Sequence, residues 1–360
     1  ASTASLSILL HSVIVDPYVW ILGRFITGFS IISIFVVVES WLNDRATNRT
    51  RGKVLSIYMI ITFIGIGLGT LLLNFNSPTN YEPFILVSLL LSIALVPILL
   101  TKRKPPTFKK ISRIKIKELY KISPLGTFSM FCVGFIHPAI FTMGAVYGAL
   151  MNFSVLEISL YLFLITLAGA LFQWPIGYLS DLFDRRIILI ITALVGSILS
   201  ILCFFSVTVS PDFINLSDNW KNIIQHISNH RFVFYIFISL YAGMSLPLFS
   251  LNLAYVNDFL PKEKFVSAGA GMQIIFGLSA MISPFVCSFF MRELGPNGIF
   301  IFLFIFQTLI GIFGIYRMTR RSSGENPDNT FTPMPRNITP LGMELDPDTG
   351  VDLTNKENKN

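Results

Sequence analysis

The chain has 360 residues, of which 53% are hydrophobic and only 13% are charged, and its formal net charge is +7. Soluble domains average about 25% charged residues, so the composition argues against a soluble globular protein. The basic residues stand beside apolar runs and lack interleaved aromatics, which argues against nucleic acid as a partner.

Apolar runs of roughly 20 residues recur along the chain, and such a run crosses a hydrocarbon core as a helix. Lipid offers backbone groups no hydrogen-bond partner, so only helices or closed barrels can span it. Because the runs are continuous rather than alternating, the sequence predicts an all-α membrane protein. The expected segments, the first of them incomplete, are 1–15, 18–40, 54–73, 82–101, 123–149, 156–178, 187–208, 232–256, 266–290 and 297–316.

The connectors between these segments alternate in charge. One set holds 20 Lys and Arg, and the opposite set holds 3. Cytoplasmic loops are rich in Lys and Arg, so this bias predicts a multi-pass protein of the inner (plasma) membrane with a cytoplasmic C-terminus. Connector 102–121 is basic with interspersed isoleucines, and is either an interfacial helix on an anionic leaflet or a solvated connector.

A repeat indicates how the segments are organised. Trp41-Leu42-Asn43-Asp44 and Tyr255-Val256-Asn257-Asp258 lie 214 residues apart, and a charged loop and a Gly-rich apolar segment follow each. Duplicated bundles of this size are typical of transporters. We expect two pseudo-symmetric six-helix bundles, with about ten of twelve helices present. The expected parts are a truncated N-terminal bundle (1–101), a basic cytoplasmic linker (102–122), a C-terminal six-helix bundle (123–317) and a disordered cytoplasmic tail (318–360).

Two motifs resemble those of the major facilitator superfamily. The stretch from Gly177 to Arg186 resembles the loop signature of that family, with Leu182 where the family usually has a cation. The stretch from Arg24 to Ser30 is similar to the fourth-helix signature of proton-coupled facilitators, with Thr27 in place of Gln. The resemblance implies an all-α facilitator fold and a secondary transporter that works by alternating access.

Shorter matches resemble a poorly characterised bacterial branch near the drug-efflux facilitators: Gln173 to Gly177, Glu39 to Trp41, and Arg51 to Lys53. In such facilitators the first, fourth, seventh and tenth helices line the cavity. The resemblance therefore implies a substrate or proton pathway that includes Arg24, His137, Tyr147, Tyr241 and Asn252, joined by Gln173, Trp174 and Gln273 from neighbouring helices.

Two of these residues allow a second interpretation. Arg24 either faces the central cavity or snorkels to the outer interface. His137, beside the helix-kinking Pro138, either relays protons or bonds a backbone carbonyl that the proline frees.

The short turn from Asp181 to Arg186 predicts a cytoplasmic gate. Arg185 and Arg186 could bridge to acids of the other bundle, with Glu39 and Asp44 as natural partners, and Asp181 would take part in the same latch. The alternative for the two arginines is simple anchoring at the cytoplasmic face.

The sequence has no nucleophile–base arrangement, phosphate-binding loop or metal-ligand cluster, so we expect no enzyme activity, no cofactor and no metal. Without a nucleotide loop, the proton gradient is the expected energy source. The expected partners are a small amphipathic or lipophilic solute, H⁺ and the bilayer, and the protein is expected to be a monomer. The rival hypotheses are a facilitator-like sensor or scaffold without transport, and a membrane-embedded transferase.

Overall fold

The computed structural model describes residues 1–47, 50–77, 80–100, 114–208, 232–320 and 330–349. Within these ranges the chain is helical and contains no strand. Eight of its helical stretches are long and apolar enough to cross a membrane, and two shorter apolar helices accompany them, Ser2–Val13 and Glu82–Pro97. The predicted all-α membrane class is therefore confirmed, and each of the ten predicted segments corresponds to a helical stretch.

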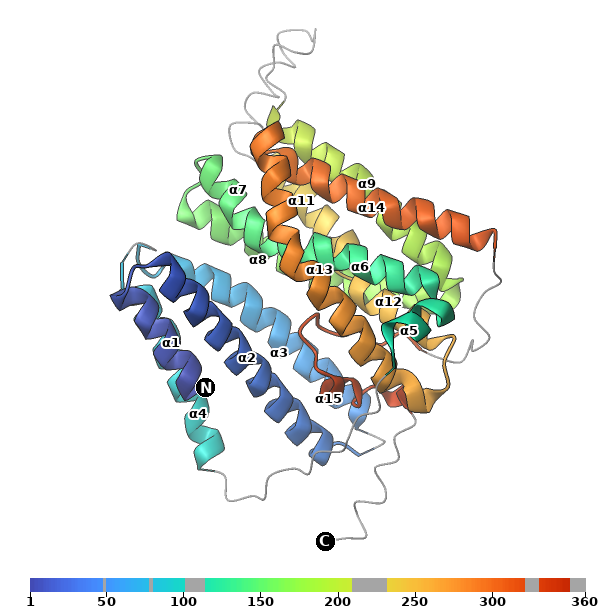
Figure 1. The fold of residues 1–360 in the computed structure, drawn as a ribbon, viewed down its shortest axis with the longest axis horizontal. Coiled ribbons are helices and arrows are strands. Elements are labelled where there is room, and N and C mark those ends of the chain that lie inside the picture. The colour runs from blue at the N-terminus through green and yellow to red at the C-terminus, as the bar shows by residue number, and fades with distance from the viewer. Residues whose placement is uncertain (48–49, 78–79, 101–113, 209–231, 321–329, 350–360) are drawn as a thin grey trace, which may run out of the picture.

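A first group of helices gathers on one side of the molecule (Figure 1). It consists of α1 (Ser2–Val13), α2 (Pro17–Arg45), α3 (Arg51–Leu71) and α4 (Glu82–Leu99). The start of α2 is fixed locally, because the Asp16 carboxylate accepts hydrogen bonds from the backbone N–H groups of Tyr18 (2.9 Å) and Val19 (3.0 Å). In this group α1 packs against both α2 and α4, whereas α3 packs against α8 of the second group.

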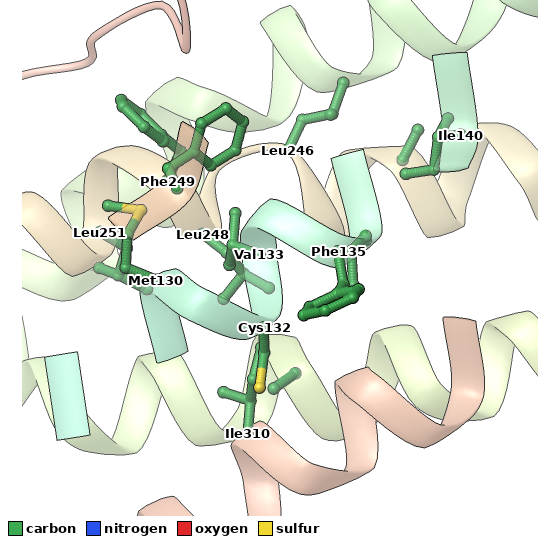
Figure 2. Packing of buried hydrophobic residues seen from close by; sticks show 14 of the residues in the cluster. Met130, Cys132, Val133, Phe135, Ile140, Leu246, Leu248, Phe249, Leu251 and Ile310 are labelled. Carbon is green, nitrogen blue, oxygen red and sulfur yellow. The ribbon is translucent and has the colours of Figure 1, made fainter. Parts of the chain in front are cut away.

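The second group holds the larger part of the core. Its helices are α5 (Ile116–Ile122), α6 (Pro124–Pro138), α7 (Gly144–Leu150), α8 (Val155–Leu182), α9 (Arg185–Thr208), α11 (Phe232–Ser245), α12 (Leu248–Asn257), α13 (Phe265–Leu294) and α14 (Gly298–Met318). The closest pairs are α6 with α13 and α9 with α14. Figure 2 shows Met130, Cys132 and Val133 of α6 among side chains of α12 and α14, including Leu248 and Ile310.

Two predicted single helices are broken at prolines. After Pro138, the chain makes a π-helical turn, Ala139–Met143, before it continues as α7. Between α11 and α12, Leu246 and Pro247 interrupt the helix. Proline has no N–H and its ring crowds the preceding turn, so each break follows from the sequence. π-helical turns often occur at functional sites.

The C-terminal segment, residues 330–349, corrects the prediction of a disordered tail from 318 onward. It is folded, and its short helix α15 (Pro340–Met343) packs against α2 and α13, between the two groups (Figure 1). Met334, Ile338 and Leu345 are buried, which stabilises the docked segment in the way that core residues do. Residues 101–113, 209–231, 321–329 and 350–360 lie outside the described residues.

Candidate functional site

The first and second groups border an open hollow where α3 meets α8. It has a volume of about 390 Å³ and is lined by α3, α8 and the C-terminal segment. Phe63, Trp174 and Phe331 make its wall aromatic and apolar. We call it the interbundle cavity. Its volume lies within the range of about 300–1,000 Å³ that is usual for small-molecule sites.

A second, smaller hollow lies beside it. It has a volume of about 30 Å³ and is bordered by His137, Phe141, Gln173 and Arg336, among others. Because Gln173 also lines the interbundle cavity, the two hollows are neighbours. Two polar atoms of these residues, His137 Nδ1 and Gln173 Oε1, are buried without a hydrogen-bond partner in the part of the chain that the structure describes. The smaller hollow thus offers polar contacts to a water molecule or a proton.

A third, larger groove of about 620 Å³ runs along α2 and α4. All its lining residues belong to the first group, from Ala1 to Leu95. It therefore does not lie between the two groups, unlike the interbundle cavity.

Two aromatic rings of α8 define one side of the interbundle cavity. Trp174 and Tyr178 are four residues apart and so lie on one face of the helix. Their rings stack, with centroids 6.1 Å apart and planes at 16°. Although it lines the cavity, Trp174 is 77% exposed. An open, flat aromatic face of this kind suits an apolar or amphipathic ligand.

His137 is held at the end of α6 by the break between α11 and α12. Its Nε2 donates a hydrogen bond to the carbonyl oxygen of Ser245, at 3.1 Å. Ser245 is the last residue of α11, where carbonyl groups lack partners within the helix. The carbonyl that His137 binds is therefore freed by the end of α11 rather than by Pro138. The ring is buried and borders the smaller hollow, and its Nδ1 has no hydrogen-bond partner among the described residues.

An ionic cluster marks the end of the molecule where α15 lies, which we call the α15 end. Arg185 forms ion pairs with Asp181, at 2.9 Å, and with Asp258. Arg186 pairs with Asp184 at 2.5 Å. Burial opposes ionisation of Asp184, but the hydrogen bonds from Arg186 prevail and hold the pKa of Asp184 below its ordinary value. These ion pairs all lie within the second group, whereas the predicted latch joins the two groups.

Glu39 contacts a different element from the one predicted. Its side chain is fully buried and accepts hydrogen bonds from the backbone N–H groups of Thr339 (2.9 Å) and Gly342 (3.1 Å). The hydroxyl groups of Thr339 and Tyr58 also donate to it, the latter at 2.7 Å. Glu39 therefore binds the C-terminal segment, and its partners do not include Arg185 or Arg186.

The other predicted site residues fall into three places. Arg24 and Asp44 are exposed on α2, away from the interbundle cavity. Tyr147, Tyr241 and Asn252 are buried inside the second group, and the Asn252 side chain donates to the Leu248 carbonyl of its own helix at 2.8 Å. Gln273 donates to the backbone carbonyl of Arg336, at 2.9 Å, in the C-terminal segment. The structure thus brings Gln173, Trp174 and His137 to the two hollows.

Sequence reasoning missed Arg336 and Thr339, because the tail was assigned to disorder. A signal was present: Met334, Ile338, Leu341 and Leu345 follow one another at helical spacings of three and four residues. A periodic apolar pattern in a Pro- and Thr-rich stretch indicates a segment that docks.

Among the described residues, eight membrane-length helices and two shorter apolar ones, with a hollow shared by two helix groups, indicate a multi-pass membrane protein of transporter architecture. The sequence model of the Major Facilitator Superfamily matches residues 1–217 and 151–345, so the chain belongs to this superfamily and is a membrane transporter. Two similar proteins, from Escherichia fergusonii and Escherichia coli, are each named "Uncharacterized MFS-type transporter YcaD". Each is 23% identical over 286 residues, which is 79% of this chain and 68% of the relative. No solved structure matches the chain.

Proposed function

We propose that the protein moves a small amphipathic or apolar solute across the bilayer by alternating access, with helices α1–α4 rocking against α6–α14. The observation that carries this is the interbundle cavity, which has a volume of about 390 Å³ and is lined by both groups. A cavity between two groups opens to one end or the other when the groups rock. The aromatic wall favours a lipophilic solute over a sugar, which would need many more hydrogen-bonding groups.

His137 is the residue to which we assign proton coupling. Its Nε2 is anchored on the Ser245 carbonyl, and the ring borders the smaller hollow. Histidine ordinarily gains and loses a proton near physiological pH. Here burial and the Arg336 cation at the same hollow both oppose protonation of the ring, so proton uptake belongs to a state in which the C-terminal segment has moved away. A coupled proton would make the proton gradient the energy source of transport.

We also propose that the α15 end is cytoplasmic and that the membrane is the plasma (inner) membrane. The connectors expected on that side hold 20 Lys and Arg, against 3 on the other. A C-terminal fusion to green fluorescent protein should therefore be fluorescent, and a fusion to periplasmic alkaline phosphatase should be inactive. The reverse pair of results would place the tail outside.

Transport is tested by counterflow in proteoliposomes. Vesicles loaded with an unlabelled lipophilic cation, aromatic acid or neutral amphipath are given the labelled form of the same compound outside. Accumulation supports a transporter, and a pH-sensitive dye inside the vesicle reports any proton that moves with the solute. Binding of a solute without exchange would favour the sensor or scaffold hypothesis.

Replacing Trp174 with alanine is expected to raise the solute concentration for half-maximal counterflow by about tenfold or more. The substitution removes part of the aromatic wall, and with it roughly 1.5 kcal/mol or more of apolar contact with the solute. Phe285→Ala on α13 is the matched control, because Phe285 is also 77% exposed but does not line the interbundle cavity. Equal effects of the two substitutions would show that Trp174 does not contact the solute.

A further inference from the structure

We infer that the C-terminal segment, residues 330–349, binds between the two helix groups and holds them together at the α15 end until the segment is displaced. This inference deepens the transport function proposed above and rests on it for its consequence. The structural part of the inference does not depend on transport: one segment of the chain is bonded to both helix groups at once.

The contacts with the first group centre on Glu39. This buried carboxylate accepts hydrogen bonds from the backbone of Thr339 and Gly342, both in the C-terminal segment. The side chain of Asn43 donates to the carbonyl oxygen of Leu341. Two backbone N–H groups and one hydroxyl group of the segment converge on this carboxyl group, so Glu39 is the main anchor on the first group.

The contacts with the second group fall on α8, α12 and α13. Asp181 accepts a hydrogen bond from the backbone N–H of Phe331, at 2.7 Å. Ser250 exchanges two hydrogen bonds with the backbone of Met334, both 2.9 Å. Gln273 donates to the carbonyl of the segment's Arg336. Because one segment is bonded to both groups, the groups cannot separate at the α15 end while it is docked.

Three glycines provide the close fit. A Cβ atom on Gly177 of α8 would lie 2.2 Å from the Phe331 ring, and one on Gly269 of α13 would lie 2.2 Å from the Met343 sulfur. A Cβ on Gly342 would lie 2.6 Å from the Glu39 carboxyl carbon. Real Cβ atoms do not approach other atoms so closely. The surfaces on both helix groups and on the segment are therefore complementary in shape.

Arg336 makes the docked state reversible. Its guanidinium carbon lies 3.7 Å from the centre of the Phe141 ring, and among the described residues no carboxylate pairs with it. Burial lowers the pKa of Arg336 to about 10. Enclosing a cation without an anion opposes docking, although the aromatic face offsets part of this. Glu39 therefore stabilises the docked segment, and Arg336 destabilises it.

The test uses the full-length protein in nanodiscs at pH 7.5 and needs no substrate. Hydrogen–deuterium exchange is followed on peptides from 330–349 in the wild type and in Gly342→Ala, which is designed to collide with Glu39. Alanine is a better helix former than glycine, so the variant does not damage the free segment. We expect exchange in the segment to rise at least tenfold and exchange in the membrane helices to stay unchanged.

A second readout reports on the surface that the segment covers. Ser250→Cys, fully buried under the segment, is introduced after the native cysteines have been replaced, and its reaction with a membrane-impermeant maleimide is timed. Labelling should be at least ten times faster when Gly342→Ala is also present. Glu39→Ala should act like Gly342→Ala, and Tyr58→Phe, which spares the segment's own bonds, should have little effect.

One further variant should have the opposite effect and dock more tightly than the wild type. Arg336→Met keeps an unbranched apolar stem and removes the buried charge, so it should slow exchange in 330–349 below the wild-type rate. Exchange at free-peptide rates in the wild type, or unchanged exchange and labelling in Gly342→Ala, would overturn the inference. Neither result would bear on transport, which the counterflow assay tests. Failure of counterflow in a protein whose segment is protected would refute transport and leave this inference standing.

Discussion

Replacing Gly134 with alanine is expected to lower the midpoint of thermal unfolding by about 5 °C, because it forces apart the two helices that form the centre of the second group. A Cβ there would lie 1.9 Å from the Ser279 hydroxyl and 2.6 Å from the Phe276 carbonyl oxygen of α13. The hydroxyl can rotate, but the backbone oxygen cannot move without shifting the helix. Overpacking of this kind costs about 1–3 kcal/mol, and the shift follows from the usual size scaling.

The measurement is intrinsic fluorescence of the detergent-solubilised protein during a temperature ramp. Gly277→Ala is the matched control, because Gly277 lies on α13 beside Phe276, and a Cβ there would meet nothing within 4 Å. The control should unfold at or slightly above the wild-type temperature, since it gains the same helix propensity as Gly134→Ala without a collision. A similar fall in both variants would show that close α6–α13 contact is not what Gly134 provides.

Docking of the C-terminal segment is expected to strengthen as pH falls from 6 to 4. Burial raises the pKa of Asp346 from 3.8 to about 6 in the docked state. Its charged neighbours are Asp348, which raises this pKa, and Arg185, which lowers it. Above pH 6 the carboxyl is ionised whether docked or free, and the docked state bears the full penalty of burying that charge. Below pH 6 the docked carboxyl takes up a proton first, so docking improves about tenfold per pH unit until the free carboxyl also protonates.

Between pH 6 and pH 4 docking therefore improves about 30-fold, which is roughly 2 kcal/mol. Nitroxides are attached at Pro347→Cys and Lys264→Cys, two exposed positions. Pulsed electron–electron double resonance then measures the fraction of molecules in which the distance between the two nitroxides is the short one of the docked state. Asp346→Asn should dock more tightly than the wild type at pH 7.5 and lose the dependence between pH 4 and pH 6. A wild-type response that weakens with falling pH would contradict the assignment.

The membrane helices could be predicted from the sequence because their signal is local. A run of roughly 20 apolar residues reports a span whatever it packs against. The breaks after Pro138 and at Pro247 have a local cause, since proline lacks an N–H, but proline positions alone do not locate them, because α8 and α13 continue through Pro175 and Pro284. The ends of the predicted segments differ from those observed by a few residues, because caps such as Asp16 and Ser154 set the starts of α2 and α8.

Some of the residues named from the sequence line the two hollows: Gln173 and Trp174 lie on the interbundle cavity and His137 on the smaller hollow, and their roles stay predictions. Glu39 was predicted to be a gate partner of Arg185 and Arg186, but its hydrogen bonds go to the C-terminal segment and Tyr58. Arg185 instead pairs with Asp258, the acid that ends the repeated Tyr-Val-Asn-Asp motif, within its own group. A charge pattern identifies which residues need a partner, and it cannot choose among several acids that lie at the same end.

By itself, the sequence determined that this protein is a helical membrane transporter built from repeated apolar segments. It determined these things because hydrophobic length and proline breaks act on each stretch separately. Only the tertiary structure decided what closes the α15 end: Glu39 and Thr339 are 300 residues apart, and the hydrogen bonds between them depend on the packing of every helix in between. Shape complementarity at Gly177, Gly269 and Gly342 is likewise a property of paired surfaces, which no single stretch of sequence carries.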